Sequence, residues 1–174
     1  MKTIVFLILA GMLFSCKNTP KQEIVEKQQP TKELTKLEQL YLLPKDSIYE
    51  FYDLSNDSIK KLPDLSEYAI KKLDLSYNQI DSLIQDRLPK NIEHLNLSNN
   101  LFKGRFFLDD FSKTLKYMNL SGNKISDYNA NAFLIRLILS NNELKSVAFG
   151  NKKMNFLDLS NNPKLSNEVF FDPK

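Results

Sequence analysis

Residues that could support catalysis are sparse in this chain, which has one histidine and one cysteine among its 174 residues. His94 is followed by Ser98, and Asp74 precedes both. Together they supply the three residue types of a Ser-His-Asp triad. The apolar alternation around them places His94 and Ser98 on one short strand, with nothing nearby to enclose a substrate. We therefore predict that the chain is not an enzyme and holds no cofactor.

Two carboxylates could begin a metal site. Asp53 and Asp74 occupy equivalent positions in successive segments, and would lie about 4.8 Å apart if those segments paired as parallel strands. A hard cation such as calcium needs six or more oxygen ligands. The same position later holds Ile138, which interrupts the polar series. This interruption favours solvated strand residues, and we predict no bound metal.

These residues belong to the phrase L-x-L-S-x-N, which recurs about every twenty residues. The copies, including a degenerate first one, are Tyr52–Asp57, Leu73–Asn78, Leu95–Asn100, Met118–Asn123, Leu137–Asn142 and Leu157–Asn162. Their closing residues are separated by 21, 22, 23, 19 and 20 residues. Self-similarity at such a period is typical of a solenoid. Repeat positions are numbered below so that each closing residue is position 9.

The pattern resembles the leucine-rich repeat family over roughly residues 45–174. That resemblance implies an α/β-type repeat solenoid, with a short parallel β-sheet on the concave face and irregular or 3₁₀ convex segments. The residues agree, because apolar side chains at positions 4 and 6 alternate as in a strand with one buried face. A single coil cannot bury its own apolar face, so the coils must stack. We predict a leucine-rich repeat domain of about six repeats over residues 49–174.

The segments between the copies are expected to supply the convex side of the core. Their apolar residues are Leu62, Leu65, Leu83, Leu88, Phe106 to Leu108, Phe111, Phe133, Val147 and Phe149. Pro63 and Pro89 favour irregular turns or 3₁₀ pieces over long helices.

The closing residue of each repeat is expected to be structural. Asparagine offers one carbonyl acceptor and two N–H donors, so it can bond both its own turn and the adjacent coil. Asp57 only accepts, which we interpret as a sign that the stack begins there. The predicted structural ladder consists of Asp57, Asn78, Asn100, Asn123, Asn142 and Asn162.

Position 3 is the favoured binding candidate, because it should lie on the concave surface and is rich in aromatic and arginine residues, which are enriched at binding hot spots. With Ile138 at position 5, the predicted contact residues are Phe51, Lys72, His94, Tyr117, Arg136, Ile138 and Phe156. A protein or peptide ligand is the partner that this surface favours. The alternative is that aromatic and β-branched residues simply suit a strand surface.

Nucleic acid is a poor fit as a partner. The formal net charge is only +3, and the predicted concave face mixes both signs, with Asp74 and Glu93 beside Lys72 and Arg136. Nucleic-acid surfaces instead gather one sign of charge along a stripe.

The amino-terminal residues have the pattern of an export signal. Lys2 precedes an apolar run over residues 4–14, which is too short to span a membrane as a helix. The sequence Leu13-Phe14-Ser15-Cys16 resembles the bacterial lipobox, in a bulky variant similar to lipoproteins of the Bacteroidota group. The resemblance implies a lipoprotein signal peptide over residues 1–15 and acylation of Cys16. The alternative is an ordinary signal peptide with an incidental cysteine.

A lipidated Cys16 would anchor the protein in the bacterial cell envelope, at the outer membrane, because several acyl chains give stable attachment. The sequence leaves open whether the domain faces the periplasm or the outside. Residues 16–32 are polar and read as a flexible tether.

The two ends of the solenoid need cover. Residues 33–48 carry Leu34, Leu37 and Leu40 at helical spacing, and we predict an amphipathic cap helix there, beginning near Thr31. A partner-binding helix is the alternative. The carboxy-terminal end has less cover, which allows weak end-to-end self-association. The alternative function is therefore a structural envelope scaffold that acts through its ends.

Overall fold

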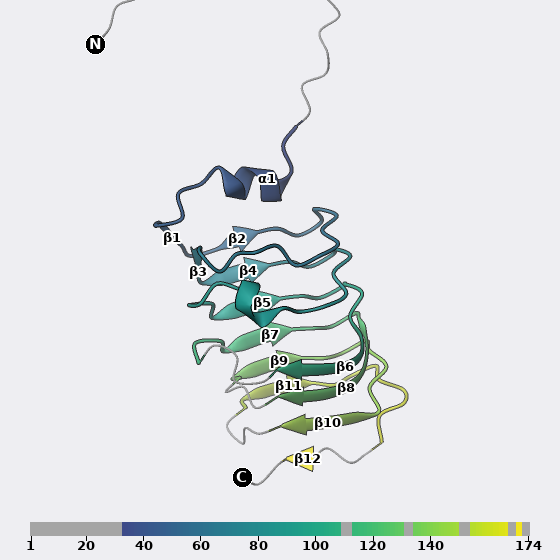
Figure 1. Cartoon of the computed structure of the whole chain (residues 1–174). Coiled ribbons are helices and arrows are strands. Elements are labelled where there is room, and N and C mark those ends of the chain that lie inside the picture. Colours follow the sequence, from purple (N-terminus) through teal and green to yellow (C-terminus); the bar gives the residue numbers. More distant parts are fainter. Residues whose placement is uncertain (1–32, 109–112, 131–133, 150–153, 167–169, 172–174) are drawn as a thin grey trace, which may run out of the picture. The chain divides into compact units, whose positions relative to one another are not determined.

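The computed structural model describes residues 33–108, 113–130, 134–149, 154–166 and 170–171. These residues form a parallel-sheet solenoid with few helices, as predicted, in which each coil adds one strand to a sheet (Figure 1). This six-stranded sheet, here called the concave sheet, has the order β11-β9-β7-β5-β4-β2. Its strands are β2 (Tyr52–Asp53), β4 (Lys72–Asp74), β5 (His94–Asn96), β7 (Tyr117–Asn119), β9 (Arg136–Ile138) and β11 (Phe156–Asp158).

Strand pairing confirms the predicted repeat register. Leu73 pairs with Leu95, Leu95 with Met118, and Met118 with Leu137, so position 4 forms one continuous column. These side chains are buried, as are the position-6 leucines such as Leu97. One strand face therefore packs into the core and the other remains open.

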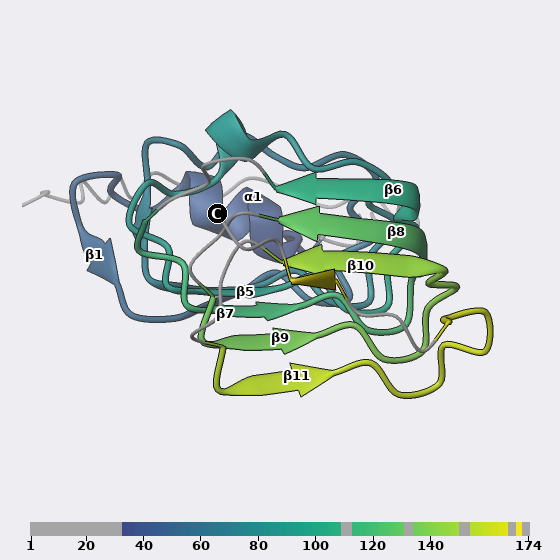
Figure 2. The same cartoon turned by 90° about the horizontal axis from the view of Figure 1, so that it is seen from below.

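A second parallel sheet lies across the core from the concave sheet. The prediction of irregular or 3₁₀ convex segments was wrong for this part of the chain. Four successive coils contribute strands instead of irregular pieces, in the order β12-β10-β8-β6 (Figure 2). The strands are β6 (Lys103–Leu108), β8 (Lys124–Ala130), β10 (Ser146–Phe149) and β12 (Phe170–Phe171).

Alternation along β6 explains why this segment forms a strand. Phe106 and Leu108 point into the core, while Arg105 and Phe107 point outward. Phe107 is 47% exposed, so its assignment to the core was wrong. Val147 is buried as predicted. Phe111 and Phe133 lie outside the described residues.

The irregular and 3₁₀ prediction holds for the earlier coils. A short 3₁₀ helix, η1 (Gln85–Arg87), forms in the second coil. Leu62 and Leu65 are buried, and the Arg87 guanidinium donates to the Leu62 carbonyl at 3.0 Å. A small two-stranded sheet pairs β1 (Ile48–Tyr49) with β3 (Ala69–Ile70).

The amino-terminal helix is shorter than predicted. Helix α1 spans Lys36–Tyr41, not residues 33–48, and its N-cap is Thr35 instead of Thr31. Thr35 forms a capping box with Glu38, which fixes the first turn at this point. Leu40 is fully buried against the first coil. No helix within the described ranges is long and apolar enough to cross a membrane.

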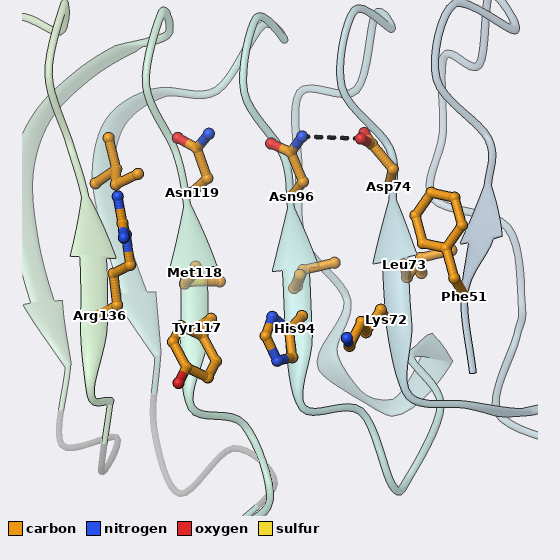
Figure 3. Close-up of a pocket in the computed structure, with 12 residues that line it drawn as sticks. Phe51, Lys72, Leu73, Asp74, His94, Asn96, Tyr117, Met118, Asn119 and Arg136 are labelled. Carbon is orange, nitrogen blue, oxygen red and sulfur yellow. Dashed lines mark hydrogen bonds between the residues drawn. The ribbon is translucent and has the colours of Figure 1, made fainter. Parts of the chain in front are cut away.

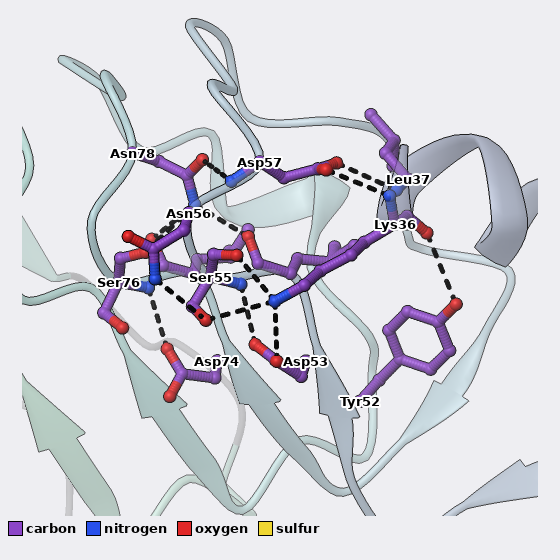
Figure 4. A network of polar contacts seen from close by, with 12 residues as sticks. Lys36, Leu37, Tyr52, Asp53, Ser55, Asn56, Asp57, Asp74, Ser76 and Asn78 are labelled. Carbon is purple, nitrogen blue, oxygen red and sulfur yellow. Dashed lines mark hydrogen bonds and ion pairs between the residues drawn. The ribbon is translucent and has the colours of Figure 1, made fainter. Parts of the chain in front are cut away.

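Asp57 joins this helix to the stack (Figure 4). Its two carboxylate oxygens accept hydrogen bonds from the backbone N–H groups of Lys36 and Leu37, each at 2.9 Å. These N–H groups belong to the first helical turn, where they have no partner within the helix. A carboxylate at this position therefore suits the first coil, which faces a helix terminus.

The asparagines at position 9 bond each coil to the one before it. In Asn78, Oδ1 accepts from the Ile59 N–H at 2.9 Å, and Nδ2 donates to the Leu54 carbonyl at 2.8 Å. Nδ2 also donates to carbonyls of its own turn. The same arrangement recurs at Asn100, Asn123, Asn142 and Asn162. These buried amides satisfy backbone groups that water cannot reach.

Candidate binding surface

The concave sheet brings the position-3 residues into one row (Figure 3). Strand pairing sets Lys72, His94, Tyr117, Arg136 and Phe156 side by side in that order. Because side chains alternate along a strand, positions 3 and 5 share the open face and position 4 forms its floor. The sequence thus predicted which side chains are neighbours.

Ring contacts hold this row in place. The rings of His94 and Tyr117 stack with centroids 4.1 Å apart and planes at 15°. The Arg136 guanidinium lies 4.1 Å from the ring centre of Phe156. Contacts of these kinds each contribute about 0.5–1.5 kcal/mol. The row therefore presents an ordered surface to a ligand.

A groove of about 510 Å³ lies over β4, β5, β7 and β9. It is lined by Phe51, Lys72, Leu73, Asp74, His94, Leu95, Asn96, Tyr117, Met118, Asn119, Arg136 and Ile138. Six of the seven predicted contact residues are among them. The seventh, Phe156, is not part of the groove lining, but its ring contacts Arg136, which is.

The aspartates at position 5 accept hydrogen bonds from neighbouring residues. Asp74 accepts the Ser76 N–H at 2.8 Å and the Asn96 Nδ2 at 3.0 Å. Asp53 accepts the Ser55 N–H and the Lys36 Nζ. Such side-chain bonds to the backbone two residues on shape the turn that follows each strand. The part of the chain that the structure describes contains no cluster of three or more His, Cys, Asp or Glu residues suited to a metal.

The charges at position 2 neutralise one another. The Lys71 ammonium lies 2.6 Å from a Glu50 carboxylate oxygen, and that of Lys116 lies 3.7 Å from a Glu93 oxygen. Exposed pairs of this kind contribute at most about 1 kcal/mol to stability. Their main consequence is to leave this row without net charge.

His94 lies in a positive local field. Its pKa is lowered from the ordinary value, first because burial disfavours the charged imidazole and then because Lys72 and Lys116 repel it. Glu93 opposes this shift without cancelling it. The pKa of His94 therefore reflects its burial first and the surplus of lysine charge around it second.

The residues of the hypothetical triad do not assemble. The His94 ring stacks on Tyr117, while Ser98 is buried with its backbone N–H on Asn96 Oδ1. Among the residues described, no hydrogen bond joins His94 to Ser98 or to Asp74. The described part of the concave face is therefore an open surface on which His94 is not placed to activate Ser98.

The residues at position 8 adopt a left-handed backbone conformation, which was not predicted from the sequence. All six residues there have positive φ: Asn56, Tyr77, Asn99, Gly122, Asn141 and Asn161. Asparagine and glycine adopt this conformation readily, whereas a tyrosine does so at a cost. Tyr77 is also 60% exposed. A lone aromatic in an Asn and Gly column was the available signal of a strained surface residue.

Comparisons with known proteins support the leucine-rich repeat family. One leucine-rich repeat model matches residues 70–83 and 111–127, and a second matches residues 91–113. Leucine-rich repeat domains in general are non-enzymatic scaffolds for protein–protein interaction. No curated protein and no solved structure matched the chain. Cys16 and the predicted signal peptide lie outside the described residues.

Proposed function

We propose that this protein is a non-enzymatic binding module that holds another protein or a peptide in the groove of its concave sheet. The observation that carries this proposal is the ordered position-3 row. Within this row His94 stacks on Tyr117 and Arg136 lies over the Phe156 ring, and the row borders an open groove. Preorganised side chains lower the entropy that binding would otherwise cost.

A crosslinking pull-down from native envelopes tests the proposal. The test variant is Tyr117→Asp, Ile138→Asp, Phe156→Asp. The matched control replaces three exposed apolar residues outside the groove lining, Ile84→Asp, Leu101→Asp and Phe107→Asp, and so adds the same charge. Both variants are first checked for a cooperative unfolding transition.

We expect the wild type and the control to capture the same partner and the groove variant to lose it. Equal capture by all three proteins would move the site away from the concave sheet. The scaffold function would then be the better account.

We also propose that Cys16 is acylated and that this lipid anchors the protein in the bacterial cell envelope. The lipobox-like sequence before Cys16 supports this proposal. Replacing Cys16 by Ser should release the protein to the soluble fraction and remove the mass of the acyl groups. Retention of the Cys16→Ser protein in membranes would contradict a lipid anchor.

A structural scaffold that acts through its ends is the second candidate. In the last described coil, Leu157 and Leu159 are only partly buried, whereas the equivalent Leu137 and Leu139 are fully buried. Partly exposed core leucines would favour association with another chain. Analytical ultracentrifugation tests this candidate, because Leu157→Lys should abolish any self-association and leave groove binding unchanged.

A further inference from the structure

We propose that the groove recognises an acidic polypeptide segment, lying extended across the strands, whose carboxylates pair with Lys72 and Arg136. This inference rests on the concave-face binding proposed above and adds the chemistry of the ligand. It follows from the charges that remain without a partner after the internal contacts of the sheet are assigned.

The acidic residues near the groove are already engaged. Glu50 and Glu93 pair with Lys71 and Lys116 at position 2. Asp74, the one carboxylate in the groove lining, accepts from Ser76 and Asn96. The lysines offset the charges of Glu50 and Glu93, whereas Asp74 keeps its charge. The groove lining therefore carries two cations, Lys72 and Arg136, against one carboxylate.

The two cations of the position-3 row remain available. Within the described parts of the chain, no acidic side chain pairs with Lys72 or Arg136, and both are exposed. Arg136 lies over the Phe156 ring, a contact that does not use its N–H donors, which point outward in the plane of the guanidinium. A bidentate carboxylate matches that fork of donors.

The spacing of these cations suits an extended chain. Lys72 and Arg136 are on β4 and β9, which are three strand spacings, or about 14 Å, apart. An extended peptide advances about 13 Å in four residues and returns to the same face. Carboxylates about four residues apart would therefore reach both cations at once.

Two rings, His94 and Tyr117, lie between the cations and stack on each other, so one face of each ring is covered. The edges of aromatic rings carry partial positive charge and suit the oxygen atoms of carboxylates and peptide carbonyls. Burial is the main reason for the lowered pKa of His94, and Lys72 and Lys116 lower it further, which agrees with an excess of positive charge beside the ring.

The test selects random peptides, displayed on phage and long enough to cross the groove, against the full-length protein. Each selected peptide is then compared with its amide counterpart, in which Asp and Glu become Asn and Gln. Binding is also measured to the Lys72→Gln, Arg136→Gln variant. Its matched control is Lys103→Gln, Lys124→Gln, which removes the same charge from the second sheet.

We expect selected peptides to contain acidic residues about four apart. Their affinity should fall at least about tenfold, or 1.4 kcal/mol, in the amide form and in the Lys72, Arg136 variant, but not in the control. It should also weaken with added salt. Because His94 is the single histidine of the chain, its NMR titration reports the groove directly, and a bound carboxylate should raise its pKa.

Two outcomes would overturn the inference. Neutral or basic peptides that bind in the groove and lose affinity in the Tyr117→Asp, Ile138→Asp, Phe156→Asp variant would contradict acidic recognition and leave groove binding intact. Binding of polygalacturonate, but of no acidic peptide, would replace the polypeptide by an anionic polysaccharide. Peptides whose binding is unaffected by that groove variant would instead contradict the proposed function itself.

Discussion

The two larger parallel sheets of this solenoid enclose one core but are specified by different features of the sequence. The concave sheet is built from strands of two or three residues whose every position follows the repeat. The second sheet uses strands of up to seven residues that share no repeated phrase. Leucine columns fill the first side of the core, whereas Phe106 stacks on Tyr128, with ring centres 5.9 Å apart, on the second.

The open faces of the two sheets differ as well. The concave face carries stacked rings and two cations, Lys72 and Arg136, that have no acidic partner among the described residues. On the second sheet, Asp127 accepts hydrogen bonds from Ser126 and Ser146, and charges of both signs are interspersed. The repeat thus accounts for the fold, and the residues that vary within it form the surface for which we propose binding.

The aromatic side of the core should show the largest effect of a single substitution. Phe106→Ala is expected to lower the free energy of unfolding by about 3–5 kcal/mol, because it leaves a cavity beside Tyr128. Phe107→Ala, at the exposed neighbour, should change it by less than about 1 kcal/mol. Urea denaturation measures both. Equal losses would contradict the assignment of Phe106 to the core and of Phe107 to the outer face of β6.

The leucine side should respond in the same way. Leu97→Ala is expected to cost about 2–5 kcal/mol, because Leu97 is fully buried at position 6. Leu101→Ala is the control, since Leu101 is 46% exposed. A negligible loss for Leu97→Ala, measured by urea denaturation, would contradict the repeat register.

The turn between the two sheets depends on asparagine donors. Asn100→Asp should cost about 3 kcal/mol at neutral pH, because a buried carboxylate would face the carbonyls of Leu75 and Leu97. Asp57→Asn should cost only about 1 kcal/mol, since one acceptor for the helix N–H groups remains. Thermal unfolding compares the two changes. Similar losses would show that Asp57 is an ordinary ladder position.

The strained tyrosine at the edge of the concave sheet predicts a gain in stability. Tyr77→Asn should raise the free energy of unfolding by about 1 kcal/mol, because asparagine tolerates φ of 54° better. Tyr77→Phe keeps the Cβ strain and should leave stability unchanged. No gain in Tyr77→Asn would mean that the Tyr77 ring makes a compensating contact.

The smallest expected effect is a pH dependence that comes from the groove. Because the pKa of His94 is lowered in the fold, the unfolded chain binds this proton more tightly, and stability rises with pH. Stability should therefore decline as pH falls from about 6.5 through the lower pKa of the folded state. Urea denaturation of His94→Gln should show a flat profile in that window. An identical decline in the variant would assign the effect to other groups.

Periodicity made the concave side predictable. The spacing of Leu95, Leu97 and Asn100 defines a strand, its buried face and the turn that closes it, and the same spacing in each repeat placed the position-3 row. Ring stacking between His94 and Tyr117 depends on side-chain conformation, which no spacing specifies.

The second sheet was not predictable in the same way. Gly104 has φ of 70°, and the strand register shifts directly after it. The alternation of Phe106 and Leu108 therefore does not continue the pattern of the preceding residues. The helix boundary was misplaced because Thr31 and Thr35 are both plausible N-caps in the sequence. Only Thr35 has Glu38 three residues later to complete the capping box.

The central claim is that the concave sheet, and not the second sheet, contacts the partner. Photo-crosslinking tests it most directly, with benzoylphenylalanine placed at Tyr117 in one protein and at Phe107 in a matched one. Both positions are on open sheet faces. We predict a partner adduct from position 117 that an excess of unmodified protein suppresses, and none from position 107. An adduct from position 107 alone, or equally from both, would contradict concave-face recognition.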